Sequence, residues 1–148
     1  HAVGIGTTLL LHCDAVVVAD DAKLLMPFTK LGLVPEGGSS LLLARRVGAA
    51  RARWWLMAAA PIPGREAAEA GLATRAVADA EVEATAMAMA GTLAALPPES
   101  LRETKRLLRA PDEAALDAAM AAEAVAFRDR LNSAEAQAIF AAFLGRKG

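Results

Sequence analysis

LGLVPEGGSSLLLARRVG, residues Leu31 to Gly48, is the most distinctive segment of this chain. It places one carboxylate, Glu36, between a proline and two glycines, just ahead of two serines and an apolar run. Pro35 fixes its own φ angle, and Gly37 and Gly38 allow backbone conformations that residues with side chains resist. The sequence therefore predicts a tight bend at this point.

A helix is expected directly after the bend. Ser39 or Ser40 can cap it, because a serine hydroxyl accepts a hydrogen bond from the free amides of a first helical turn. The apolar body of this helix is Leu41 to Leu43, and Gly48 lies where a helix commonly ends. Glu36 is then held on a loop in front of a helix N-terminus, a position that suits a carboxylate used for proton transfer. The alternative interpretation is a carboxylate that only complements the helix dipole.

The composition describes one domain with a hydrophobic core. The chain has 148 residues, 55% of them hydrophobic, and a net charge of −1. Lys and Arg number 16 against 17 Asp and Glu, without a basic stripe, which argues against a nucleic-acid partner. Cys13 is the single cysteine, and charged residues or glycines interrupt every apolar run before the length of about 20 residues that a membrane helix needs. We expect a soluble, cytoplasmic protein without a disulfide, a metal site or a membrane partner.

Three ordered blocks of sequence resemble the crotonase superfamily of enoyl-CoA hydratases and isomerases. They are AVGIGTTLLLHCDAVVVADDAKLLMPF (Ala2 to Phe28), the stretch quoted above, and GREAAEAGLATRAV (Gly64 to Val77). The resemblance implies an α/β chain with part of the crotonase-like (ClpP/crotonase) fold. Residues 1–78 would be the C-terminal part of the catalytic core, and residues 79–148 a helical tail for trimerisation and active-site closure. Further residues are expected upstream, carrying the first strands and much of the CoA-binding surface.

The glycine turn at Gly4-Ile5-Gly6 precedes a short helix predicted for residues 7–12. A helix N-terminus presents free N–H groups to developing negative charge. The resemblance implies that the backbone N–H of Ile5 is one of the two donors of an oxyanion hole, and that Gly4 and Thr8 lie in the substrate-binding region. A glycine turn that merely permits tight helix packing is the alternative interpretation.

Two positions depart from the hydratase pattern. The hydratases that resemble this chain carry one catalytic glutamate shortly after the glycine turn and another directly after the proline of the next block. Here those positions are Thr8 and Phe28, and neither side chain is a general acid or base near neutral pH. Glu36 is left, at the position where the Δ3,Δ2-enoyl-CoA isomerase branch carries its single catalytic carboxylate. The resemblance thus implies an isomerase in which Phe28 and Leu33 line the acyl chain.

Apolar spacing and prolines predict the other elements. Strands are expected at 14–19 and 23–26 and an extended piece at 72–77, and helices at 50–60, 65–70, 81–96, 99–109, 111–131 and 134–144. In the resembling family such a tail packs against neighbouring subunits. Phe143 and Arg146 lie where some members contact CoA, and an amphipathic helix end with solvated cations is the alternative interpretation.

These observations predict an acyl-CoA enzyme, most closely a Δ3,Δ2-enoyl-CoA isomerase with Glu36 as its acid and base. It would form a homotrimer or hexamer and would need no cofactor, since the CoA thioester is its substrate. One alternative is enoyl-CoA hydration or another crotonase-type reaction, because one fold supports several chemistries. Another is a catalytically incomplete fragment that acts only as an assembly module.

Overall fold

Short strands and helices alternate over the first half of the chain in the computed structural model, which describes residues 1–145. One sheet has the order β1-β3-β4, and a second pairs β2 with β5. The pairs β1–β3 and β2–β5 are parallel, with Ala2 opposite Leu24 and Val18 opposite Ala76, whereas β3 and β4 are antiparallel. The strands are β1 (Ala2–Val3), β2 (Val17–Ala19), β3 (Lys23–Leu25), β4 (Ile62–Pro63) and β5 (Arg75–Val77).

The helices of this half lie between and beside the strands. Gly48, with φ of 84°, separates α2 from α3 and lets the two helices turn against each other. Gly64 begins α4 where a Cβ atom would lie 1.9 Å from the carbonyl oxygen of Ala19, so only glycine lets this helix approach β2. The helices are α1 (Ile5–Thr8), α2 (Ser39–Val47), α3 (Ala49–Met57) and α4 (Gly64–Glu69), with 3-10 turns at Leu9–His12 and Thr29–Leu31.

The hydrophobic core fills the space between these helices and the sheets. Trp55 is 2% exposed and contributes the largest buried side chain, whereas its neighbour Trp54 is 65% exposed on the other face of α3. Burial of a large apolar side chain stabilises the fold by about 1.5–3 kcal/mol. Other core residues are Leu11, Val16, Leu24, Met26, Phe28, Leu33, Leu43, Val47, Leu56, Ile62, Ala67 and Leu72.

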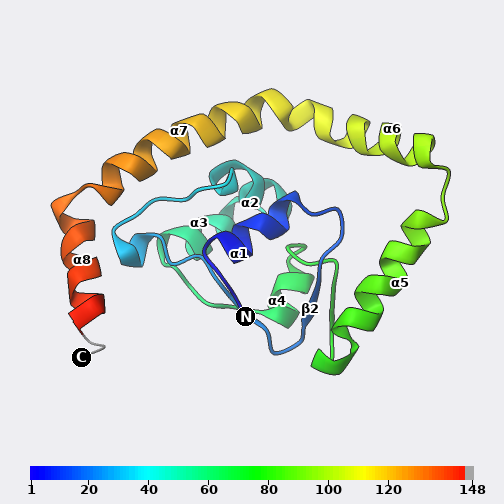
Figure 1. Ribbon diagram of the computed structural model, residues 1–148, viewed down its shortest axis with the longest axis horizontal. Coiled ribbons are helices and arrows are strands. Elements are labelled where there is room, and N and C mark those ends of the chain that lie inside the picture. Colours follow the sequence, from blue (N-terminus) through cyan, green and yellow to red (C-terminus); the bar gives the residue numbers. More distant parts are fainter. Residues whose placement is uncertain (146–148) are drawn as a thin grey trace.

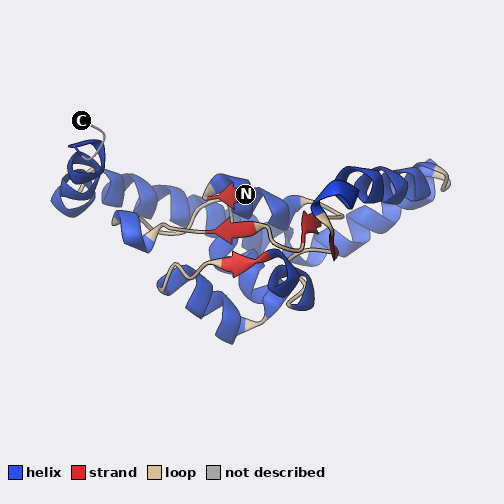
Figure 2. Cartoon of the chain, turned by 90° about the horizontal axis from the view of Figure 1, so that it is seen from below, coloured by secondary structure: helices blue, strands red, loops and turns tan. Residues whose placement is uncertain are grey.

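A tail of helices follows β5 and arches around the core, with α5 at the right, α6 and α7 across the top and α8 at the left in Figure 1. Helix α7 packs against α2, α5 against β2, and α8 against the 3-10 turn at Thr29–Leu31. Seen from below in Figure 2, the tail helices extend past the strands on either side. The tail comprises α5 (Val82–Ala94), α6 (Pro98–Arg109), α7 (Glu113–Leu131) and α8 (Ala134–Gly145), with 3-10 turns at Asp79–Glu81 and Ala110–Asp112.

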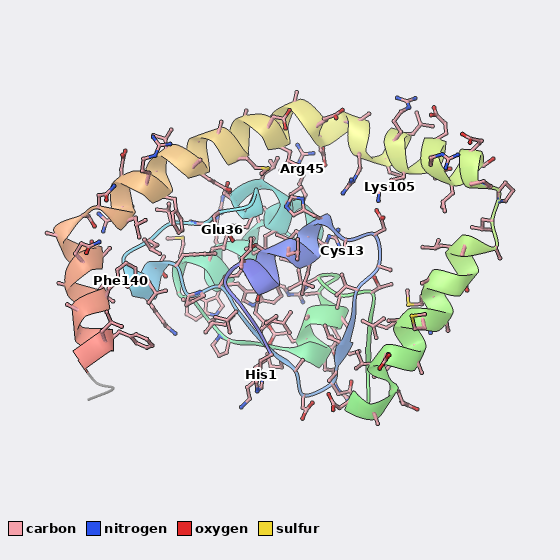
Figure 3. All side chains as sticks on the ribbon, viewed as in Figure 1. His1, Cys13, Glu36, Arg45, Lys105 and Phe140 are labelled. Atoms are coloured by element: carbon pink, nitrogen blue, oxygen red, sulfur yellow. The ribbon has the colours of Figure 1, made fainter. Side chains whose placement is uncertain are left out.

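Polar contacts attach the tail to the core at several points. Arg45 on α2 pairs with Asp112, and Lys105 on α6 pairs with Asp14; Figure 3 labels both basic residues. Farther along, Arg130 Nε donates to the carbonyl oxygen of Gly32 at 2.9 Å. Exposed ion pairs contribute at most about 1 kcal/mol each, so they orient the tail more than they stabilise it.

Several predicted elements differ in extent from the structure. The helix expected at residues 50–60 ends at Met57, and the extended piece expected at 72–77 is a strand only at Arg75–Val77. The helix expected at residues 7–12 begins earlier, at Ile5, and continues as a 3-10 turn to His12. The strand expected at residues 14–19 is only Val17–Ala19; just before it, the amide of Val16 donates to the side chain of Thr74 at 3.0 Å. Within residues 1–145, every helix is too short or too polar to span a lipid bilayer.

Candidate active site around Glu36

Glu36 lies in the irregular stretch just before α2, as the sequence predicted, and its side chain is half-buried. Its carbonyl oxygen accepts two hydrogen bonds from Ser39, one from the amide at 3.1 Å and one from the hydroxyl at 2.7 Å. Ser39 is fully buried. The backbone of Glu36 is therefore fixed by the first residue of α2.

The carboxylate of Glu36 is held by Thr8. The Thr8 hydroxyl donates to Glu36 Oε1 at 2.5 Å, and the Thr8 side chain is completely buried. The carbonyl oxygen of Ile5 is a second acceptor but lies farther away, at 3.4 Å. Since a hydroxyl has one hydrogen to donate, the shorter contact with the carboxylate takes it. Figure 3 shows Glu36 beside α1, where this bond directs its side chain.

The N-terminus of α1 lies on the same side of the core. Gly4 has φ of 58° and ψ of −123° and precedes the helix. Its amide donates to the carbonyl oxygen of Leu25 at 2.8 Å, and its own carbonyl oxygen accepts the amides of Thr7 and Thr8. Ile5 is the first residue of α1, a position whose amide has no acceptor within the helix. The Ile5 side chain is 62% exposed, so only its backbone is positioned by the fold.

His12 binds the glycine turn that follows Glu36. Its Nε2 atom lies 2.7 Å from the carbonyl oxygen of Gly37, and because a carbonyl only accepts, Nε2 carries the hydrogen. Gly37 has φ of 66°, and a Cβ atom there would lie 3.5 Å from Thr8 Oγ1. The turn thus lies directly against the first helical segment of the chain.

A second carboxylate reaches this turn from the tail. Glu123 on α7 is 7% exposed; its Oε2 accepts the amide of Gly38 at 2.6 Å and its Oε1 the amide of Ser40 at 2.8 Å. The prediction that Ser39 or Ser40 caps α2 is wrong. Gly38 occupies the cap position and offers no side chain, the Ser39 hydroxyl bonds the carbonyl of Glu36, and Glu123 supplies the acceptors instead.

The sequence contained a signal for Glu123. Leu116, Met120 and Phe127 follow helical spacing along α7, and Glu123 falls on the same stripe, where an apolar residue is expected. The half-buried residues of α7 include Leu116 and Phe127. A carboxylate on the inward stripe of a helix requires hydrogen-bond donors on the facing element.

The other predicted site residues are distributed between the core and the tail. Phe28 and Leu33 are 5% and 9% exposed and pack in the hydrophobic core, so their contact with an acyl chain stays a prediction. Phe143 on α8 is 58% exposed, and its contact with CoA also stays a prediction. Arg146 lies outside the described residues. Across residues 1–145, no group of three or more His, Cys, Asp or Glu side chains is arranged to hold a metal ion.

Comparison with known proteins identifies the family of this chain. The family model described as Enoyl-CoA hydratase/isomerase matches residues 1–148. Enoyl-CoA delta isomerase 2 of Rattus norvegicus is 35% identical over 99% of this chain and 37% of its own length. A probable enoyl-CoA hydratase of Rhodobacter capsulatus is 37% identical over 83% of this chain and 48% of its own.

Solved structures agree with the sequence comparison. The crystal structure of an enoyl-CoA hydratase/isomerase from Pseudoalteromonas atlantica superposes with a TM-score of 0.94 and 41% identity over 98% of this chain and 58% of that one. The predicted crotonase-like fold class is thereby confirmed. The chain spans about half the length of the relatives it matches, between 37% and 58% for these three. Along its whole length, it belongs to the enoyl-CoA hydratase/isomerase family.

Proposed function

We propose that the complete protein isomerises 3-enoyl-CoA to 2-enoyl-CoA with Glu36 as its single acid and base. The observation that carries the proposal is the 2.5 Å hydrogen bond from Thr8 to Glu36. Thr8 and Phe28 occupy the positions of the two hydratase glutamates, and both are buried without an ionisable group. Glu36 is therefore the carboxylate available at the first turn of α1.

One carboxylate is sufficient for this isomerisation. Glu36 removes a proton from C2, and the electron pair of that C–H bond delocalises into the thioester carbonyl to give a dienolate. The amide of Ile5 and a second amide, contributed by another part of the complete protein, stabilise the oxyanion. Protonated Glu36 then returns the proton to C4, and the double bond moves into conjugation. No water is consumed and no net proton is gained or lost.

Thr8 orients the base in this proposal. Its hydroxyl donates a hydrogen bond to Oε1 of Glu36, so Oε2 is the oxygen that takes the proton from C2 and returns it to C4. A hydrogen bond to a charged group contributes about 1.5–3 kcal/mol, enough to favour one side-chain orientation. Hydration would require a second acid or base to activate water, and the alcohol at Thr8 and the phenyl ring at Phe28 cannot supply it.

The substitution Glu36→Gln in the complete protein tests this function. Conversion of 3-hexenoyl-CoA to 2-hexenoyl-CoA should fall by about 10²- to 10⁴-fold, the usual contribution of a general acid-base group. Binding of hexanoyl-CoA, measured by calorimetry, should be unchanged because the amide is nearly isosteric. Near-normal turnover by Glu36→Gln contradicts the assignment. A wild-type protein that hydrates 2-hexenoyl-CoA faster than it isomerises 3-hexenoyl-CoA favours the hydratase alternative instead.

Assembly into a homotrimer or hexamer is part of the same proposal. Helices α5 and α6 bury no residue within the chain. Several large apolar side chains on them or on the short connection between them are exposed, namely Met87, Leu93, Leu96, Leu107 and Leu108. Exposed apolar surface of this kind marks an interaction site, and neighbouring subunits would cover it.

A further inference from the structure

The inward-facing carboxylate of α7 is the most unusual side chain of the tail. Within residues 1–145, Glu123 is the only charged residue that is buried. Both of its oxygens accept backbone amides, at 2.6 Å from Gly38 and 2.8 Å from Ser40. Hydrogen bonds to an ionised acceptor are roughly twice as strong as neutral ones, and the N-terminus of α2 adds a favourable dipole.

The carboxylate contributes to stability, because a buried amide that loses its acceptor destabilises the fold. Leu116 and Phe127 on the same face of α7 show that an apolar residue could pack here. An apolar residue at position 123 would leave the amides of Gly38 and Ser40 without these acceptors. The carboxylate also holds the segment that contains the amides of Gly38 and Ser40 in one conformation.

That segment is the glycine turn, which has little conformational preference of its own. Gly37 and Gly38 have φ of 66° and 74°, values that glycine adopts readily but shares with many other conformations. Helix α7 lies directly against the turn, because a Cβ atom on Gly38 would lie 2.4 Å from Leu116 Cδ1. The bonded amide of Gly38 is two residues from Glu36. Contacts with other parts of the chain therefore determine the conformation of the turn, and the turn determines the direction of the Glu36 carboxylate.

We infer that Glu123 is a positioning residue for Glu36. Its carboxylate holds the amides of Gly38 and Ser40, this fixes the glycine turn, and the turn keeps the Glu36 carboxylate at Thr8 and the first turn of α1. Glu123 acts through the backbone and touches no reacting atom. The inference rests on the proposed isomerase function, since it names how the tail prepares the base of that reaction.

The test compares Glu123→Gln with wild type in the complete protein. A glutamine has one acceptor oxygen, so one of the two amides loses its partner and faces an NH₂ group. Turnover of 3-hexenoyl-CoA is measured per binding site, using the stoichiometry of hexanoyl-CoA binding to count folded sites. The value of kcat per site should fall by about 10²-fold, the cost of a small misplacement of a catalytic group, with KM unchanged.

Phe127→Ala is the matched control. Phe127 lies one turn beyond Glu123 on α7 and packs against the hydrophobic core, so its truncation loosens the tail without touching the amides of the turn. It should lower Tm at least as much as Glu123→Gln and still retain wild-type kcat per site. If Glu123→Gln does not bind hexanoyl-CoA, Glu123→Asp is measured instead. Aspartate keeps both acceptors one methylene farther away, and its kcat per site should fall at least tenfold.

The outcomes separate this inference from the function on which it rests. A wild-type protein without isomerase activity contradicts the proposed function and this inference together. Wild-type isomerase activity with unchanged kcat per site in Glu123→Gln, or in Glu123→Asp where that variant is used, overturns this inference alone. Equal losses of kcat per site in Glu123→Gln and Phe127→Ala also overturn it, because a general loosening of the tail would then explain the effect.

Discussion

At the scale of single residues, the contact between Thr8 and Glu36 is central to the proposed chemistry. A fully buried hydroxyl lies 2.5 Å from a half-buried carboxylate. Thr8→Val preserves the side-chain shape and removes the hydroxyl, so the Glu36 carboxylate loses this hydrogen-bond donor. We predict that kcat per site for 3-enoyl-CoA isomerisation falls about tenfold, in line with about 1.5 kcal/mol for a bond to a charged group. Thr8→Ser, which retains the hydroxyl, should keep most of the activity, and equal losses in both variants would contradict this role.

The local part of this site could be predicted from the sequence. Glu36, its loop position and the positive φ angles of Gly37 and Gly38 follow from residues that are adjacent in the chain. Glu123 could not be paired with the turn in the same way, because 85 residues separate it from Gly38. Serine side chains at positions 39 and 40 offered a local cap that satisfied the usual rules. The tertiary contact replaced it, since the Ser39 hydroxyl bonds the carbonyl of Glu36.

At the scale of elements, the approach of α7 to the start of α2 sets the shape of the site. Gly38→Ala should lower the free energy of unfolding. Gly38 has φ of 74° and ψ of 8°, in the left-handed region, and a Cβ atom there would lie 2.4 Å from the end of the Leu116 side chain. The left-handed backbone costs about 1–2 kcal/mol for a residue with a side chain, and the displacement of Leu116 adds about 1 kcal/mol. Urea unfolding of Gly38→Ala and of wild type measures the sum.

The double substitution Gly38→Ala with Leu116→Ala separates strain from overlap. Truncation of Leu116 removes the overlap with the new Cβ atom, so the double variant should regain the part of the free energy of unfolding that the overlap cost. The effects of the two substitutions should therefore be non-additive, as expected for residues in contact. If the two changes in the free energy of unfolding simply add, Leu116 of α7 does not contact the turn at position 38.

A second element-scale prediction concerns the exposed helix α5. Gly91 lies within this helix, and a Cβ atom there would have no neighbour within 4 Å. Gly91→Ala should therefore raise the free energy of unfolding by about 0.5–1 kcal/mol, since alanine loses less backbone entropy than glycine on helix formation. A loss of stability in the assembled protein would instead show that a neighbouring subunit packs closely against position 91.

At the scale of the whole molecule, the helical tail contacts the candidate site through Glu123 and would contact neighbouring subunits in the proposed assembly. The sequence predicted the helices of the tail from their periodicity and prolines, but not their path around the core. The path depends on contacts between distant residues, such as Lys105 with Asp14 and Arg130 with the carbonyl of Gly32. No residue of α5 or α6 is fully buried within this chain, and in the proposed assembly neighbouring subunits would cover their exposed apolar side chains.

Assembly can be tested on the exposed face of α6. Leu107 and Leu108 are 58% and 76% exposed, and burial of such side chains against a neighbour would stabilise the oligomer. Leu107→Glu combined with Leu108→Glu should convert a trimer or hexamer into smaller species in native mass spectrometry. Arg102→Glu on the same helix is the control for a change of charge alone. An unchanged oligomer in the double variant would show that this face of α6 is not part of the interface.

In the proposed isomerisation one carboxylate carries a proton from C2 to C4, and a deuterium label follows that proton. The complete wild-type protein is given 3-hexenoyl-CoA deuterated at C2, and the 2-enoyl product of a single turnover is analysed for label at C4. Part of the deuterium should appear at C4, because Glu36 removes and returns the same hydrogen. Product whose new C4 hydrogen comes entirely from solvent, formed at the normal rate, would rule out this role of Glu36.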